Sequence, residues 1–327
     1  MKAAFVRRTG PPEVIEYGDL PAPEPQHGEV LVRVKAAAVD PIDAYIRQGR
    51  VAMDLPFPFV IGRDLAGVVE RTGAGVTRFK AGDRVWCNNQ GIDGRQGSFA
   101  ELAAVREDLL YALPDAVDFA AMMALAHSGL TACLGIERIG GLSAGQLVLV
   151  AGGAGNVGRA VTQVAAGLGA RVIATAGSEE GRAICRADGA EAALDYRSPS
   201  LEAELGAAAP DGIDVYWDTS GRQDLEFALR HMRRGGRIVV MSGLAARPVL
   251  PVGALYVKDI AIIGIAITYA TSAEMRASAD RLNTLAAAGR LRARVARTLP
   301  LSEARHAHEL IEAKDVRLDG KIIVLPP

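Results

Sequence analysis

The stretch Gln146-Leu-Val-Leu-Val-Ala-Gly-Gly-Ala-Gly-Asn-Val-Gly158 decides the fold of this chain. Its apolar start is typical of a buried strand, and the residues that follow it through Leu168 are apolar at helical spacing. Between strand and helix, Gly153, Gly155 and Gly158 form the pattern G-x-G-x-x-G. The stretch therefore predicts a strand, a glycine loop and a helix in immediate succession.

Each glycine of this loop has a distinct role in a dinucleotide site. Gly153 permits the tight turn, Gly155 lets a pyrophosphate approach the backbone, and Gly158 lets the helix pack close to its strand. The N–H groups of Asn156 and Val157 then face the phosphates from the positive end of the helix. By itself, the pattern is equally compatible with an ordinary glycine-rich turn in a strand–helix unit.

The residues after the loop alternate between short apolar runs and helical stretches. This alternation is typical of a parallel, doubly wound sheet, so we predict an α/β Rossmann domain over residues 123–266. The predicted strands are Arg171–Thr175, a strand ending at Leu194-Asp195, Ile213–Asp218, Arg237–Met241 and a strongly apolar run, Val257–Ile267.

Residues 1–122 have the pattern of a compact β-barrel, with strands separated by Pro- and Gly-rich turns. The predicted elements are strands at Lys2–Arg7, Glu13–Tyr17, Glu29–Ala38, Leu65–Glu70 and Ser98–Ala104, followed by helices at Asp118–Leu125 and Ser128–Glu137. In residues 267–327, Thr271 and Glu274 form a capping box that opens a helix ending at Gly289. The tail Lys321–Leu325 is a strand that returns to the barrel domain.

Composition narrows the class of protein. A chain of 327 residues exceeds one average domain, and its net charge of −1 makes nucleic acid an improbable main partner. Three widely spaced cysteines, Cys87, Cys133 and Cys185, suggest free thiols in a reducing compartment rather than a disulfide framework. No targeting segment and no run of about 18 apolar residues stands out, so we predict a cytoplasmic protein without a membrane partner.

Six further motifs are spread over nearly the whole chain, and their order along the sequence is informative. They are Asp40-Pro-Ile-Asp-Ala-Tyr-Ile-Arg-Gln-Gly49, Gly62-Arg-Asp-Leu-Ala-Gly67, Phe79-Lys-Ala-Gly-Asp-Arg-Val85, Gly129-Leu-Thr-Ala132, Gly235-Gly-Arg-Ile-Val239 and Gly320-Lys-Ile-Ile323. With the glycine loop, they make the chain resemble the medium-chain dehydrogenase/reductase superfamily, specifically its zinc-independent quinone oxidoreductase branch, which includes ζ-crystallin. The resemblance implies a GroES-like barrel domain with a nicotinamide-binding domain inserted before its second part.

The resemblance also implies a homodimer in which the strand Val257–Ile267 pairs with the same strand of a second copy. From the residues alone, a strand this apolar fits the centre of a buried sheet equally well.

The positions that hold zinc in the alcohol dehydrogenases of this superfamily carry other residues here. Arg63-Asp64 stands where those enzymes have a His-Glu pair, and Asp40 stands near the position of a cysteine ligand. Zinc prefers thiolate and imidazole in tetrahedral sites, so we predict no metal. Without a Lewis acid, the acceptor must delocalise negative charge itself, as a quinone or an activated alkene does.

The end of the second Rossmann strand favours NADPH over NADH. An NAD site places an acid there to accept the ribose 2′-OH, but Thr175-Ala-Gly-Ser178 is small and neutral. Ser178, Arg182 and Tyr196 are candidates to meet a 2′-phosphate, with Arg182 as a substitute for a lysine common in the family. In the opposing interpretation, Glu179 turns inward and selects NAD.

Family position marks the remaining candidate site residues. Tyr45 would hydrogen-bond the acceptor carbonyl, Asp40 replaces a usual asparagine near the nicotinamide, and Thr131 lies near its carboxamide. The positions that would flank the nicotinamide or close the site are Ser242, Gly243, Ala266 and Lys321. His127 is a possible proton donor, but a structural histidine is the simpler interpretation because no partner is identifiable.

These observations predict an NADPH-dependent, zinc-independent quinone oxidoreductase acting on a small-molecule quinone or enone. One alternative is an NADPH-dependent enoyl or alkenal reductase that saturates an activated double bond. An alternative of another class is a non-catalytic, nucleotide-binding protein of the crystallin type. The natural acceptor and the proton donor do not follow from the sequence.

Overall fold

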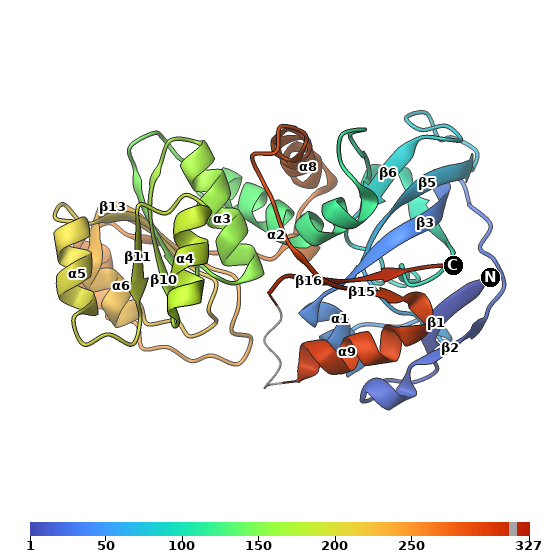
Figure 1. Cartoon of the computed structure of the whole chain (residues 1–327), viewed down its shortest axis with the longest axis horizontal. Coiled ribbons are helices and arrows are strands. Elements are labelled where there is room, and N and C mark those ends of the chain that lie inside the picture. Colours follow the sequence, from blue (N-terminus) through green and yellow to red (C-terminus); the bar gives the residue numbers. More distant parts are fainter. Residues whose placement is uncertain (314–318) are drawn as a thin grey trace. The chain divides into compact units, whose positions relative to one another are not determined.

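The structure is a computed structural model that describes residues 1–313 and 319–327. Its contacts divide it into a barrel unit, residues 1–127 with 279–327, and a nucleotide unit, residues 128–278 (Figure 1). The predicted boundaries, 122/123 and 266/267, lie 5 and 12 residues before these divisions, because helices α2 (Phe119–Arg138) and α8 (Ser272–Ala287) run across the two dividing positions. The predicted segment 267–327 includes residues 314–318, which lie outside the described residues.

The nucleotide unit contains a six-stranded parallel sheet in the order β11-β10-β9-β12-β13-β14. Its strands are β9 (Leu147–Ala151), β10 (Arg171–Ala176), β11 (Ala192–Asp195), β12 (Ile213–Asp218), β13 (Met232–Val240) and β14 (Ala261–Gly264). The connecting helices are α3 (Asn156–Gly167), α4 (Glu179–Ala187), α5 (Leu201–Ala208), α6 (Leu225–His231) and α7 (Val252–Val257). The predicted doubly wound Rossmann sheet is confirmed, and its strand order reverses at β9, where such sheets bind ligands.

One predicted strand of this sheet is wrong at both ends. The run Val257–Ile267 contains only β14, because Val257 closes α7 and Ile267 opens the 3-10 turn η3 (Ile267–Tyr269). Lys258, Asp259 and Ile260 separate α7 from β14, and Asp259 takes a φ of 51°, which no strand accommodates. The interpretation of a central strand is also wrong, since β14 lies at the edge of the sheet.

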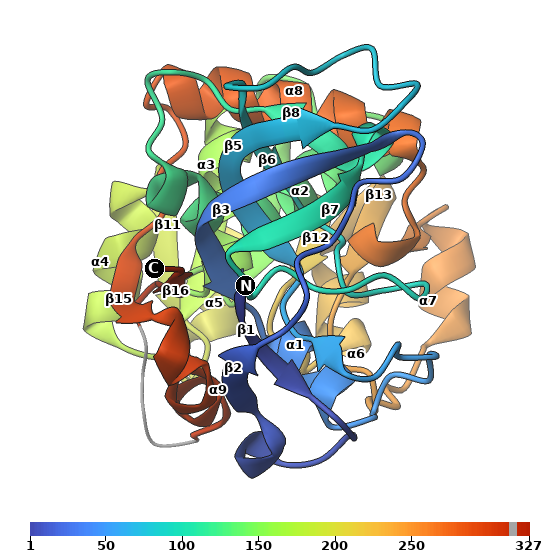
Figure 2. The same ribbon diagram turned by 90° about the vertical axis from the view of Figure 1, so that its right-hand side faces the viewer.

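The barrel unit contains a seven-stranded sheet and a three-stranded sheet (Figure 2). The larger follows the order β15-β16-β3-β5-β6-β8, with β7 also paired to β3, and the smaller the order β2-β1-β4. The strands are β1 (Lys2–Val6), β2 (Glu16–Asp19), β3 (Glu29–Val39), β4 (Phe59–Val60), β5 (Asp64–Thr72), β6 (Arg84–Cys87), β7 (Leu102–Arg106), β8 (Leu110–Ala112), β15 (Val295–Pro300) and β16 (Lys321–Leu325). The tail strand β16 pairs antiparallel with β3, so the predicted return of the chain to the barrel is confirmed.

Short elements complete the barrel unit. They are the helices α1 (Pro41–Arg47) and α9 (Ala304–Glu312) and the 3-10 turns η1 (Pro12–Val14), η2 (Glu107–Leu109) and η4 (Leu301–Glu303). The turn η1 takes the first part of the predicted strand Glu13–Tyr17, and the predicted strand Ser98–Ala104 begins later, at Leu102.

The two helices predicted around Ser128 are one continuous helix, α2. Its composition and length would suit a membrane span, but 78% of its most apolar window is buried, as in a core helix. The predicted capping box at α8 is confirmed: the Thr271 N–H donates to Glu274 Oε2 at 2.8 Å, and the Glu274 N–H donates to Thr271 Oγ1 at 3.2 Å.

Candidate active site

Strand register gathers buried polar side chains at one end of the larger barrel sheet. Antiparallel pairing of β16 and β5 with β3 brings their first residues, Lys321 and Asp64, beside Asp40, which follows the last residue of β3. Asn88 follows β6, which pairs with β5. Positions that are far apart in the sequence thus meet, and we call Asp40, Asp43, Arg63, Asp64, Asn88, His127 and Lys321 the barrel-end cluster.

The centre of this cluster is an ion pair between the Lys321 ammonium and the Asp40 carboxylate. The exposed fractions of the two side chains are 4% and 1%, so water screens their attraction little. Burial lowers the pKa of Lys321 to about 7. Asp40 also precedes helix α1, and its N–H donates to Asp43 Oδ2 at 2.8 Å. Two residues predicted separately as site residues therefore act as one pair.

The other carboxyl groups of the cluster are held in partly neutral form. Burial raises the pKa of Asp64 to about 6, although the Asn88 amide donates a hydrogen bond to this carboxylate. Burial raises the pKa of Asp43 to about 8, with the positive charge of Arg63 opposing the rise. The Arg63 guanidinium donates a hydrogen bond to the Asn89 side chain. The cluster thus contains its own cations, one ammonium and one guanidinium.

His127 lies beside two carboxylates of this cluster, a proximity that the sequence analysis did not predict. One ligand-type atom from each of Asp40, Asp64 and His127 lies within 4.8 Å of the other two. Burial lowers the pKa of His127, so the imidazole tends to the neutral form. The signal in the sequence was its position just before the motif Gly129-Leu-Thr-Ala132.

This spacing suits a metal ion, but the donor chemistry does not suit zinc. The Asp40 carboxylate is already paired with the Lys321 ammonium, and the group found among the described residues offers a single imidazole and no thiolate. The nearby Cys87 thiol donates to the Asn88 carbonyl at 3.4 Å, and burial raises its pKa far above the usual range. A protonated thiol is a poor zinc ligand.

The other two predicted catalytic residues lie on helices. Tyr45, on α1, is partly exposed, and the guanidinium carbon of Arg50 lies 4.5 Å from its ring centroid. The Tyr45 ring thus makes a cation–π contact, and Tyr45 lies on the same helix that Asp40 caps. Thr131 is 4% exposed on α2, one helical turn after His127.

In the nucleotide unit, the glycine loop has the geometry of a phosphate cradle. Gly153 and Gly158 are buried: a Cβ atom would lie 2.7 Å from the Ala174 Cβ at Gly153 and 2.3 Å from the Gly152 oxygen at Gly158. Gly155 is exposed, and the nearest atom to its Cβ position is 3.4 Å away. Gly155 also caps α3 without a side-chain hydrogen bond. Gly153 and Gly158 therefore allow close packing. Gly155 leaves the N-terminus of α3, with the N–H groups of Asn156 and Val157, open to a ligand.

The turn after β12 lies against this loop, and the sequence interpretation did not identify it. The Thr219 hydroxyl donates to the Ala151 oxygen at 2.8 Å, and Asp218 accepts from the Ser220 N–H at 2.7 Å and from its hydroxyl at 2.8 Å. The only signal was the acidic end of an otherwise apolar strand.

The predicted residues Ser242, Gly243 and Ala266 follow β13 and β14. Because β13 pairs parallel with β12, and β14 pairs parallel with β13, the three residues lie at the same carboxyl edge of the sheet. The Ser242 oxygen accepts from the Gln223 amide at 2.8 Å, and Gly243 has a φ of 86°, which favours glycine.

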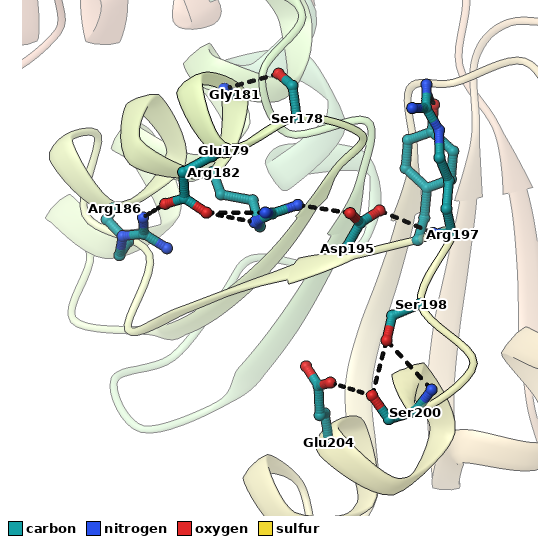
Figure 3. Close-up of polar contacts among 11 residues, drawn as sticks. Ser178, Glu179, Gly181, Arg182, Arg186, Asp195, Arg197, Ser198, Ser200 and Glu204 are labelled. Atoms are coloured by element: carbon teal, nitrogen blue, oxygen red, sulfur yellow. Dashed lines mark hydrogen bonds and ion pairs between the residues drawn. The ribbon is translucent and has the colours of Figure 1, made fainter.

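The predicted 2′-phosphate residues lie where β10 and β11 end (Figure 3). Ser178 caps α4, and its hydroxyl accepts the Gly181 N–H at 3.1 Å. Arg182 pairs with Glu179 at 2.8 Å and with Asp195 at 2.7 Å. Tyr196 is 46% exposed.

Comparison with known proteins is consistent with this geometry. Residues 26–115 match the model of the alcohol dehydrogenase GroES-like domain, and residues 156–284 match that of the zinc-binding dehydrogenase family. The quinone oxidoreductase of Rattus norvegicus is 32% identical over 327 residues, covering 99% of this chain and 98% of the relative. The structure of Escherichia coli quinone oxidoreductase complexed with NADPH superposes with a TM-score of 0.86 at 26% identity, covering 100% of both chains.

A third relative points to a neighbouring activity. The chloroplastic NADPH-dependent alkenal/one oxidoreductase of Arabidopsis thaliana is 37% identical over 255 residues, covering 76% of this chain and 64% of the relative. The two units together define a medium-chain dehydrogenase/reductase. Within that superfamily, the full-length similarity shows that the chain belongs to the quinone oxidoreductase family.

Proposed function

We propose that this chain is an NADPH-dependent oxidoreductase that reduces a quinone without zinc. The observation that carries the proposal is the Lys321–Asp40 ion pair, because it places an ammonium where zinc-dependent relatives need a metal. Family membership supports the same activity. We also propose a cytoplasmic location, which the three buried, free cysteines favour.

NADPH supplies the hydride in such a reaction. The open N-terminus of α3 binds its pyrophosphate through the N–H groups of Asn156 and Val157. Ser178 and Tyr196 bind the 2′-phosphate. Within the nucleotide unit, Thr131, Ser242, Gly243 and Ala266 contact the nicotinamide half, as their family positions imply.

On the acceptor side, the quinone ring delocalises the negative charge that it gains with the hydride. The Tyr45 hydroxyl donates a hydrogen bond to one quinone oxygen, and a proton from water completes the hydroquinone. Asp40 holds the Lys321 side chain in place, so the barrel-end cluster positions a buried ion pair, and no metal, at this end of the barrel sheet.

The test is NADPH oxidation at 340 nm by the purified chain, first treated with a chelator and assayed for bound metal. We expect turnover with 1,4-benzoquinone or 9,10-phenanthrenequinone and no loss of rate after chelation. Stoichiometric zinc in the purified chain, or a rate of NADPH oxidation that falls after chelation and returns when zinc is added, would refute the proposal that the reaction needs no zinc. Tight NADPH binding without turnover of any acceptor would favour the non-catalytic alternative.

A second candidate activity is reduction of an activated double bond, which the alkenal/one oxidoreductase relative favours. The same assay with an enone or an acrylyl thioester separates the two. Turnover confined to these acceptors would replace the quinone by the alkene as substrate.

We further propose that the chain forms a homodimer through the edge strand β14. Its outer edge is open among the described residues, and Ile262 is 37% exposed. Large apolar side chains of the segment that precedes it in the sequence are also exposed, namely Leu244, Val249, Val252, Tyr256 and Val257. Light scattering after size-exclusion chromatography should give twice the chain mass, and Ile262→Lys should give the monomer. A monomeric wild-type protein would contradict this assembly.

A further inference from the structure

The residues that follow the carboxyl ends of β10 and β11 form a small surface, which we call the β10–β11 surface. It contains an arginine, Arg197, that the sequence analysis did not single out. Ala176 and Asp195 are register partners, so the next residues, Gly177 and Tyr196, lie side by side. A Cβ atom at Gly177 would lie 2.6 Å from the Tyr196 hydroxyl oxygen. The hydroxyl therefore lies directly against the backbone that leads to Ser178.

Arg182, the expected phosphate ligand, is committed to other partners on this surface. Its Nη1 lies 2.7 Å from Asp195 Oδ2, and its Nη2 lies 2.8 Å from Glu179 Oε2 (Figure 3). Glu179 is in turn bound by Arg186. This chain of ion pairs neutralises both carboxylates, so neither Arg182 nor Glu179 offers its charge to a ligand.

Arg197 has a different environment. Its guanidinium carbon lies 5.3 Å from the Tyr196 ring centroid, and its Nη2 lies 3.3 Å from the Tyr196 hydroxyl oxygen. Its backbone N–H donates to Asp195 Oδ1 at 2.9 Å, which anchors the main chain. In the described part of the chain, no carboxylate forms an ion pair with this exposed guanidinium. The side chain is thus positioned by an aromatic ring while its charge remains available.

From this arrangement we infer that Arg197 is the residue that selects NADPH over NADH, by pairing with the 2′-phosphate beside the Tyr196 hydroxyl. The inference rests on the proposed use of NADPH. A guanidinium suits this task because its parallel N–H groups bind two oxygens of one phosphate. Arg182 is a positioning residue, since it keeps Asp195 from repelling the dianionic phosphate.

The test measures binding rather than turnover, so it does not depend on the acceptor. Dissociation constants for NADPH, NADH, adenosine 2′,5′-bisphosphate and AMP are measured by calorimetry on the full chain. We expect Arg197→Gln to weaken NADPH and the bisphosphate about 10- to 100-fold, the usual range for one lost charge-assisted contact. NADH and AMP should change less than about threefold, because they lack the 2′-phosphate.

Two matched variants give the controls. Arg171→Gln removes another exposed arginine, at the opposite end of β10, where Arg171 pairs with Glu191 at 2.7 Å, and should leave every constant unchanged. Arg197→Lys should restore part of the NADPH affinity. Circular dichroism melting checks that each variant remains folded.

Three results would overturn the inference. Equal weakening of NADPH and NADH by Arg197→Gln would indicate a general structural role. Loss of discrimination in Arg182→Gln, with none in Arg197→Gln, would assign the phosphate to Arg182. A wild-type chain without preference for NADPH would remove the premise, whereas a lack of quinone turnover alone would leave the binding result intact.

Discussion

The barrel-end cluster and the β10–β11 surface use the same kinds of side chain in opposite ways. In the barrel unit, the Lys321–Asp40 pair is at most 4% exposed, and burial shifts the pKa of Lys321 to about 7. On the β10–β11 surface, Glu179 is 69% exposed, and its partners lower its pKa. An unpaired charge in the interior strongly destabilises the fold, so buried charges must be paired. Exposed pairs contribute little stability and serve mainly to orient their side chains.

The largest expected effect is the loss of one member of the buried pair. Lys321→Met keeps the length of the side chain but leaves Asp40 without its ammonium, which should lower the free energy of unfolding by about 3–5 kcal/mol. The double variant with Asp40→Asn should recover a large part of this loss, because no buried charge remains unpaired. Urea unfolding at pH 7 measures both changes.

The tryptophans make this measurement specific for one unit. Trp86 lies in the barrel unit and Trp217 in the nucleotide unit, so a Trp217→Phe background reports barrel unfolding alone. Lys2→Met is the control, because the Lys2–Asp19 pair is 43% and 74% exposed, so water screens it and its loss should change the free energy of unfolding far less than Lys321→Met does. Equal losses for Lys2→Met and Lys321→Met would contradict the contrast between buried and exposed charge.

The second effect separates backbone from charge in the nucleotide unit. At Gly158, an added Cβ would lie 2.3 Å from the Gly152 oxygen, so Gly158→Ala should lower the free energy of unfolding by about 1–3 kcal/mol. At Gly155 there is room, so Gly155→Ala should remain stable but weaken NADPH about 10-fold by crowding the pyrophosphate. Calorimetric binding and Trp217 fluorescence in urea measure the two quantities. If Gly155→Ala instead unfolds the unit without changing affinity, the assignment of the exposed glycine to the ligand is wrong.

The two regions also differ in how far the sequence predicts them. The glycine loop lies within one continuous stretch, and each glycine there has a local task, so its structure follows from the residues themselves. The barrel-end cluster joins Asp40 to Lys321 across 281 positions. Only the register of β16, β3 and β5 creates that contact, and neither composition nor spacing encodes register over such distances.

Local backbone and side-chain contacts explain the remaining differences between the predicted and the observed structure. The apolar run around β14 suggested one long strand, but the left-handed Asp259 interrupts it. On α4, Glu179 and Arg182 are three positions apart, so their pairing was visible in the sequence as a helical neighbour contact. The assignment of Arg182 to the 2′-phosphate, made from family position, stays a prediction beside this local pairing.

A pair of intermediate exposure provides the third test. Glu274 is 35% exposed and binds Arg138 at 3.0 Å and the Thr271 N–H at 2.8 Å, and these contacts lower its pKa to about 2. The unfolded chain binds this proton near the ordinary value of 4.5, so the contribution is complete above that pH and is lost as the pH falls towards 2.

Glu274→Gln should therefore cost about 0.5–1 kcal/mol at pH 7 through the weakened cap, and nothing further on acidification. Trp217 fluorescence in a Trp86→Phe background, recorded in urea at pH 7 and at pH 4, measures the difference. A variant whose stability falls with pH as steeply as that of wild type would show that other groups dominate the acid range.

The smallest expected effect is at Glu179, the acid whose inward orientation would have selected NAD. Its carboxylate binds Arg182 and Arg186 at an exposed position, so Glu179→Gln should leave the free energy of unfolding almost unchanged. The ratio of NADPH to NADH affinity should shift less than about threefold, because Arg182 keeps its second partner, Asp195. Both constants are measured by calorimetry at low salt, where exposed charges act most strongly. A large gain in NADPH preference would mean that Glu179 repels the phosphate, and that exposed charges in this region decide binding by repulsion as well as by orientation.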